Sequence, residues 1–173
     1  ALNPDITVIG YYDAIFEDKT WPDWQYVNSH EDWFVHDING NRIERVTYPG
    51  QYLMNPNTGW SDYCAQQNKQ FLQNYPQYDG IFADDTSSDL VDDGYTFEIP
   101  FSQFEDGVLD NWGTWMLEYM QKVKTAFGSD ILMPNAWKHM EMCSEATHAI
   151  FWENFIHGRS SAYNENGLGT AGW

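Results

Sequence analysis

The stretch Tyr78-Asp79-Gly80-Ile81-Phe82-Ala83-Asp84-Asp85-Thr86 is the part of the sequence that decides the fold. Its short apolar run, residues 81–83, ends in two adjacent carboxylates and a turn. Apolar residues bounded by turn signals are typical of a buried strand in a parallel sheet that is covered on both faces. Acidic residues where such a strand ends lie where α/β folds place their active sites. The stretch therefore predicts a buried parallel strand that carries Asp84 to a functional site.

A second stretch has the same organisation. His148-Ala149-Ile150-Phe151-Trp152 is followed directly by Glu153 and Asn154. Two strands that each bring a carboxylate to one rim suggest hydrolysis of a glycosidic bond, because this reaction usually needs a carboxylate pair. We therefore expect the pair to be Asp84 and Glu153.

The two carboxylates have different expected roles. Side chains alternate along a strand, so Asp84 shares a face with Phe82, whereas Asp85 shares the other face with Ile81 and Ala83. Asp84 is thus the candidate nucleophile or base, and Asp85 supports it or caps the next segment. The large ring of Trp152 would desolvate Glu153 and favour the protonated form that a general acid needs. The alternatives are that residues 84–86 are a simple cap and that Glu153 is part of a structural ion pair.

Composition limits the possible functions. The 173 residues are enough for one domain with a sizeable core, which we take as residues 1–173. With 26 acidic and 8 basic residues the net charge is −18, which excludes nucleic-acid binding and disfavours an anionic membrane surface. Such acidity fits a secreted or cell-surface protein, or one adapted to high salt. Aromatic residues make up 17% of the chain; most belong in a core, and a few could form platforms for sugar rings.

No cofactor or metal is expected. The sequence has no P-loop, no Rossmann glycine pattern and no G-x-S-x-G motif. Cys64 and Cys143 lack metal-type spacing, and they could either form a disulfide or remain as buried thiols. The acidic residues after position 83 lack the regular calcium-loop pattern, so a solvated acidic loop is favoured; they are Asp84, Asp85, Asp89, Asp92 and Asp93. No apolar run approaches the roughly 18 residues of a membrane span.

Strands and helices alternate along the chain. Expected strands cover residues 6–12, 32–36, 51–54, 81–83, 131–133 and 148–152, and expected helices cover 60–75, 112–127 and 138–146. Long irregular stretches are expected at residues 16–50 and 86–107. Repeated βα units predict a parallel sheet, whereas a complete eight-fold barrel typically needs about 250 residues. The expected fold class is α/β, TIM-barrel-like, with an incomplete barrel or an open sheet.

Four motifs in one order give the chain a resemblance to a known family. They are Asp32-Trp33-Phe34-Val35-His36-Asp37, Gln51-Tyr52-Leu53-Met54-Asn55, Tyr78 to Asp85 as quoted above, and Trp152-Glu153-Asn154-Phe155-Ile156-His157. With these motifs in this order, the chain resembles the TIM-barrel glycoside hydrolases related to the endo-α-1,4-polygalactosaminidase group. The resemblance covers roughly residues 6–158. The resemblance implies that acidic residues ending the fourth and sixth barrel strands form the catalytic pair, here Asp84 and Glu153. The first, seventh and eighth strands have no counterpart.

Further residues could bind substrate at the same rim. They end expected strands or present rings for sugar stacking: Tyr12, Asp13, Asp85, Asn135, Trp137 and Trp152. The expected function is thus an extracellular glycoside hydrolase that cleaves a polysaccharide or oligosaccharide. The alternative is a non-catalytic glycan-binding or structural protein built on a degenerate barrel. Because an open barrel leaves free sheet edges, self-association or a partner chain that completes the ring is also possible.

Overall fold

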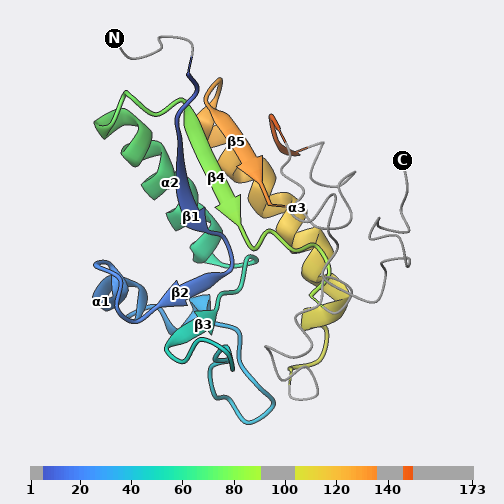
Figure 1. Cartoon of the computed structure of the whole chain (residues 1–173). Helices are drawn as coiled ribbons and strands as arrows, with labels where there is room; N and C mark the ends of the chain where they lie inside the picture. The colour runs from blue at the N-terminus through green and yellow to red at the C-terminus, as the bar shows by residue number, and fades with distance from the viewer. Residues whose placement is uncertain (1–5, 91–103, 136–145, 150–173) are drawn as a thin grey trace, which may run out of the picture.

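The computed structural model describes residues 6–90, 104–135 and 146–149. Three parallel strands form the main sheet in the order β1–β4–β5: β1 (Ile9–Asp13), β4 (Gly80–Asp84) and β5 (Ile131–Pro134). Two long helices connect them, α2 (Gly59–Asn74) and α3 (Val108–Phe127). A small antiparallel sheet of β2 (Phe16–Asp18) and β3 (Gln51–Leu53) lies below the main sheet (Figure 1). The short helices α1 (Trp24–Val27) and η1 (Glu31–Trp33) lie between β2 and β3.

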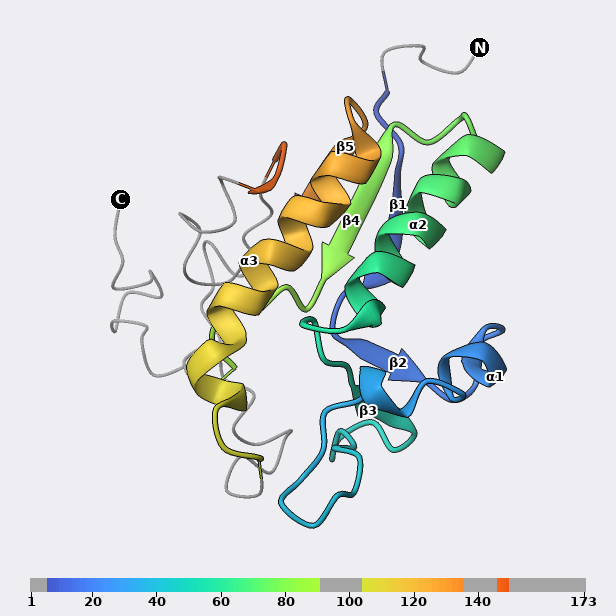
Figure 2. The ribbon, with the colours of Figure 1, turned by 180° about the vertical axis from the view of Figure 1, so that it is seen from behind.

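The main sheet has one covered face and one uncovered face within the described residues. Helices α2 and α3 pack side by side on the same face, as Figures 1 and 2 show from opposite sides. On the other face Tyr11 and Phe82 stack at 6.0 Å between ring centroids, and Tyr11 is 63% exposed. This arrangement is a segment of a TIM-barrel wall with its helices outside and its inner face open. The expected α/β, TIM-barrel-like parallel sheet is therefore confirmed.

The two helices form where the sequence predicts them. Thr58 caps α2 by accepting a hydrogen bond from the backbone N–H of Trp60 at 3.3 Å. Helix α3 ends at Gly128, whose φ of 68° is a left-handed conformation that glycine adopts without strain. The apolar stripe of α3 is buried as expected, from Trp112 through Phe127. None of the helices in the described residues is long and apolar enough to cross a membrane.

One glycine is required by the sheet itself. A Cβ atom added at Gly80 would lie 2.2 Å from the backbone oxygen of Ile131, on the neighbouring strand β5. No L-residue other than glycine can therefore begin β4 at this separation without displacing β5.

One expected strand is wrong. Residues 31–33 form the 3₁₀ helix η1, and the following Phe34 and His36 make only isolated bridges, to Met54 and Arg42. The local i→i+3 bond from the Trp33 N–H to the His30 carbonyl, at 3.0 Å, and stacking of these two rings at 4.0 Å favour a tight turn over an extended strand.

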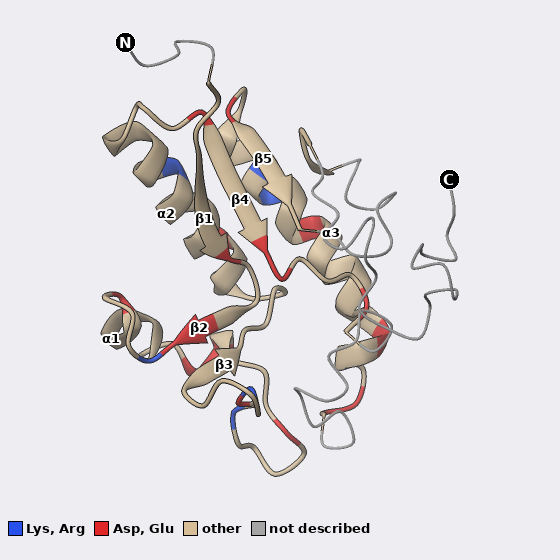
Figure 3. Ribbon diagram, viewed as in Figure 1, with Lys and Arg blue, Asp and Glu red and all other residues tan. Residues whose placement is uncertain are grey.

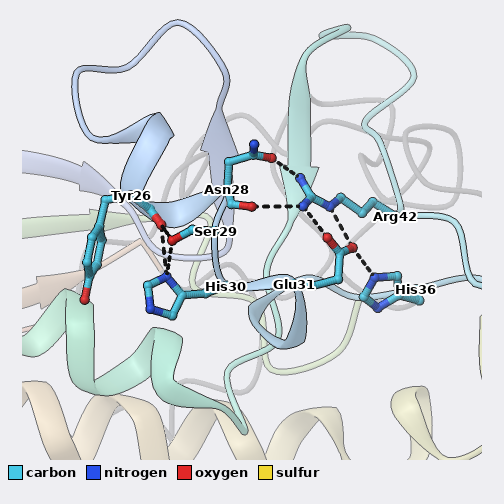
Figure 4. Close-up of polar contacts among 7 residues, drawn as sticks. All are labelled: Tyr26, Asn28, Ser29, His30, Glu31, His36 and Arg42. Carbon is cyan, nitrogen blue, oxygen red and sulfur yellow. Dashed lines mark hydrogen bonds and ion pairs between the residues drawn. The ribbon is translucent and has the colours of Figure 1, made fainter.

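A polar network holds this segment in place (Figure 4). The Arg42 Nε donates to Glu31 at 2.9 Å, and Arg42 Nη1 donates to the side chain of Asn28 at 2.7 Å. His36 contacts the same Glu31 carboxylate at 2.8 Å. The guanidinium also lies 3.6 Å from the centroid of the Phe34 ring. The side chain of Arg42 thus stabilises the segment of residues 28–42, for which the sequence shows no regular pattern.

The other expected elements are close to the observed ones. The first strand begins at Ile9 rather than at residue 6, and the strand expected at 51–54 is β3. The expected helix at 138–146 lies outside the described residues except for residue 146, and the expected strand at 148–152 is described only at residues 148 and 149.

Candidate active site

Two carboxylates lie side by side at one end of the main sheet. Asp13 ends β1 and Asp84 ends β4, and the two residues are direct partners in the parallel register. Figure 3 shows the acidic ends of β1 and β4 next to each other. Asp84 shares the open face with Phe82 and accepts a hydrogen bond from Tyr11, whereas Asp13 is buried where β1 ends. The carboxyl ends of parallel strands are where barrel enzymes place catalytic residues.

Asp84 is held by three donors. The Tyr11 hydroxyl donates to Oδ2 at 2.9 Å, while the Asn135 side-chain amide donates to Oδ1 at 2.8 Å. The backbone N–H of Asp85 also donates to Oδ1, at 3.0 Å. Because both oxygens are engaged from different directions, the carboxylate is fixed in orientation while remaining partly exposed.

Asp13 has a different environment. Its buried carboxylate accepts hydrogen bonds from the backbone N–H groups of Ile15 at 3.1 Å and Phe16 at 2.9 Å. Burial, and then the negative charge of Asp85, raise its pKa well above the ordinary value, outweighing these hydrogen bonds and the charge of Arg45. Two aligned carboxyl groups thus have unlike environments, an arrangement typical of acid–base sites and also compatible with a structural turn.

Asp85 adopts a backbone conformation that is unusual for a residue other than glycine. Its φ is 51°, in the left-handed region. Its carboxylate forms an ion pair with Arg45 at 3.2 Å, and the Arg45 guanidinium lies over the rings of Phe16 at 4.4 Å and Tyr48 at 4.6 Å. The ion pair links the end of β4 to the segment before β3.

Tyr12 does not join this group. It lies on the helix-covered face, where its hydroxyl is buried. Burial raises the pKa of Tyr12, and it interacts with Tyr119 of α3 and Cys64 of α2. The exposed Tyr11 contacts Asp84 in its place. Strand alternation is the sequence signal that could have identified Tyr11, since it is two residues before Asp13.

The remaining candidate residues fall into two groups. Asn135, which follows β5, contacts Asp84 and so belongs to the site. Glu153, Trp137 and Trp152 lie outside the described residues, so their roles stay predictions. Arg45 was missed because it lies in a stretch without periodicity.

Metal and thiol chemistry have little support in the described part of the chain. No group of three or more His, Cys, Asp or Glu side chains there could hold a metal ion. Asp92 and Asp93 of the possible calcium loop lie outside it. Cys64 is a buried thiol whose pKa is raised well above its ordinary value by burial, and Cys143 is not described.

The parallel sheet, with carboxylates at the carboxyl ends of its strands, is part of a TIM-barrel fold of the kind seen in a solved glycoside hydrolase domain. A family model described as hypothetical glycosyl hydrolase family 15 matches residues 1–169, so the chain belongs to this family. No curated protein matches the chain.

Solved structures agree on the fold. The glycoside hydrolase domain of PelA from Pseudomonas aeruginosa has a TM-score of 0.60 at 12% identity, covering 94% of this chain and 55% of that one. Aspergillus fumigatus Ega3 in complex with galactosamine has a TM-score of 0.57 at 15% identity, covering 87% of this chain and 51% of that one. Thermus thermophilus α-galactosidase in complex with stachyose has a TM-score of 0.56 at 12% identity, covering 81% and 27%.

These comparisons confirm the resemblance drawn from the four motifs. The chain is a member of a glycosyl hydrolase family and shares its fold with the glycoside hydrolase domain of PelA and with Ega3. It spans about half the length of those two chains and about a quarter of the α-galactosidase. Identities of this size relate the folds and leave substrate and mechanism to be argued from the site.

Proposed function

We propose that this chain contributes the catalytic site of a glycoside hydrolase that cleaves a polysaccharide or oligosaccharide with two carboxylates. Asp84 is the nucleophile or base, and Glu153 is the general acid. The observation that supports this most directly is the orientation of Asp84 by Tyr11, Asn135 and its own following backbone N–H. A carboxylate that serves only as a cap would not need donors from two neighbouring strands.

The other residues have supporting roles in this proposal. Asn135 and Tyr11 orient Asp84, and the ion pair with Arg45 holds Asp85 in its left-handed conformation beside it. Asp13, next to Asp84 across the sheet, hydrogen-bonds a sugar hydroxyl. Trp137 and Trp152 stack on sugar rings.

The stereochemistry follows from one distance. A separation of about 5 Å between the carboxyl groups of Asp84 and Glu153 corresponds to retention, whereas about 6.5–9.5 Å corresponds to inversion. A structure that includes both side chains will assign it.

The first experiment compares Asp84→Asn with a matched control. Asp79→Asn removes the same charge just before β4, at the opposite end of the sheet, where Asp79 accepts a bond from the Val8 N–H at 2.8 Å. Release of reducing ends is measured on a panel of polysaccharides that includes galactosamine polymers, because Ega3 was solved with galactosamine. We expect Asp84→Asn and Glu153→Gln to lose more than about a hundredfold in rate, and Asp79→Asn to keep it. Near-normal turnover in Asp84→Asn would refute the assignment.

A second function is favoured by two features of the open face. The stacked rings of Tyr11 and Phe82 offer an aromatic surface, and the outer edge of β1 has no neighbouring strand among the described residues. These features suit a glycan-binding protein, or an assembly in which a second copy or a partner chain pairs with β1. Glycan binding without turnover, or a defined oligomer in light scattering, would favour this function. In either case we propose an extracellular location, in keeping with the net charge of −18.

A further inference from the structure

A cavity of about 380 Å³ lies beside β1. Its wall is formed by β1 residues, by one side of α2 and by the segment that follows β2. Its volume is in the range of about 300–1,000 Å³ that is typical of small-molecule sites. It borders the candidate active site through Tyr11 and Asp13, but most of its wall is separate from Asp84.

The cavity is lined by a buried carboxyl group of which one oxygen has no hydrogen-bond partner among the described residues. Glu17, at the centre of β2, lines the cavity and is 1% exposed. Its Oε1 atom has no hydrogen-bond partner among the described residues. Burying such an atom is costly, and buried polar groups in folded proteins nearly always have a partner. Because Glu17 is one of the residues that line the cavity, a donor bound there is the group that could supply the missing bond.

The charged residues that line the cavity favour a positively charged ligand group. In the part of the chain that the structure describes, its lining includes three carboxylates, Asp13, Glu17 and Asp23, and no lysine or arginine. Burial, and then the charges of Asp23 and Asp18, raise the pKa of Glu17 to about 8. A positively charged occupant would relieve this repulsion, whereas an anion would add to it.

Aromatic rings supply the rest of the wall. Trp21, Trp60 and Tyr63 line the cavity. The Trp60 Nε1 donates to the Ala14 carbonyl at 3.0 Å, and the Tyr63 hydroxyl donates to Asp23 at 2.7 Å. The polar atoms of these two rings are therefore satisfied within the protein, and the rings give this part of the cavity wall an aromatic, apolar character.

We propose that this cavity, the Glu17 pocket, binds a small organic cation whose primary ammonium group donates to Glu17 and whose apolar part lies against the aromatic rings. Two sources share this chemistry, an amino sugar and a lysine side chain of a polypeptide. The binding does not depend on turnover at Asp84, so it can be tested whether or not the chain is catalytic.

Binding has a proton signature. The titratable groups that act on Glu17 are Asp23 in the following segment, Asp18 on its own strand and the Cys64 thiol of α2, and none of these is a cation. Below about pH 8 a bound ammonium requires Glu17 to lose its proton, so uptake of the cation releases close to one proton. Affinity for a lysine-type amine, with its pKa of about 10.4, should rise with pH until Glu17 is ionised.

The test is calorimetry on the full chain with two matched pairs of probes. N-acetyl-lysine amide is compared with N-acetyl-norleucine amide, and methyl glucosaminide with methyl glucoside. We expect at least one amine to bind at least tenfold more tightly than its neutral partner, with proton release seen as a dependence of the heat on the buffer. Binding of the lysine probe alone assigns a polypeptide ligand, and binding of the glucosaminide alone assigns an amino sugar.

Two variants make the test specific. Glu17→Gln keeps the shape of the protonated side chain and should weaken amine binding at least tenfold, the loss expected for a hydrogen bond to a charged group. Asp18→Asn removes a charge from the adjacent residue, which does not line the cavity, and should change affinity less than about threefold. Equal binding of amine and neutral probes, unchanged binding in folded Glu17→Gln, or no binding at millimolar concentrations would each overturn the proposal.

Discussion

Glu17→Gln is expected to stabilise the protein, and by an amount that grows with pH. Folding buries Glu17 to 1% exposure, and burial followed by the charges of Asp23 and Asp18 raises its pKa from 4.5 to about 8. The folded state therefore holds the proton more tightly than the unfolded state. Stability from this group is fully present below the unfolded pKa and is lost as pH rises toward the folded pKa.

The size of the effect follows from the two pKa values. Each pH unit between them changes the free energy of unfolding by about 1.4 kcal/mol. The accumulated loss is about 3 kcal/mol at pH 7 and nearly 5 kcal/mol above pH 8, as an order of magnitude. A glutamine side chain cannot ionise, so the variant escapes this loss. For a protein of this length about 3 kcal/mol corresponds to a rise in Tm of the order of 10 °C.

The assay is thermal and urea unfolding of both proteins between pH 5 and pH 8.5, followed by circular dichroism. The buried carboxyl of Asp13, whose pKa is also raised, is present in both proteins, so its contribution cancels in the difference. The stabilities should be nearly equal at pH 5 and diverge above it. A difference that does not depend on pH, or a variant less stable at pH 8, would refute the reasoning.

Three further substitutions test the fold and the site. Gly80→Ala should lower the free energy of unfolding, measured in urea, by about 3 kcal/mol or more, because the new Cβ would lie 2.2 Å from the Ile131 backbone oxygen. An unchanged urea midpoint would contradict the spacing of β4 and β5. Tyr11→Phe removes one donor to Asp84 and should lower kcat/KM by about three- to tenfold, while the free energy of unfolding falls by no more than about 1 kcal/mol. The pH profile of kcat/KM should also change, and an unchanged profile would exclude a positioning role for Tyr11. Thr58→Ala should lower the free energy of unfolding, measured by thermal unfolding, by about 1 kcal/mol, because it removes the cap of α2. Thr58→Ser should restore most of this stability.

The parts of the fold that could be predicted are those with local, periodic signals. The strand ending at Asp84 and the helix ending at Gly128 follow from apolar patterns bounded by breakers, and both are present. The direct alignment of Asp13 with Asp84 was not predicted, because the strand expected at residues 51–54 belongs to the separate β2–β3 sheet and leaves β1 and β4 as neighbours.

The parts that were missed depend on contacts between distant residues. Arg45 reaches Asp85 across 40 positions of sequence, and no local pattern could show that pairing. Residues 31–33 resemble a strand by composition but follow their own i→i+3 bond and the stacking of Trp33 on His30. Tyr12 was preferred over Tyr11 although alternation alone would have separated their faces.

The irregular stretch between β1 and α2 has more influence on the site than its sequence suggests. Its first residues, Ile15 and Phe16, donate their N–H groups to Asp13 and so fix the turn that ends β1. Further along, Arg45 forms the ion pair with Asp85 and covers Phe16, which connects the ends of β1 and β4 from the same side. The segment thus contacts Asp13 directly and reaches the end of β4 only through Asp85, so the two aligned carboxylates have different surroundings. Asp84 is held in the open by donors, while Asp13 is buried beside the charge of Asp85. Because the environment of a carboxyl group sets its protonation state, the segment that buries Asp13 favours its protonated form next to Asp84.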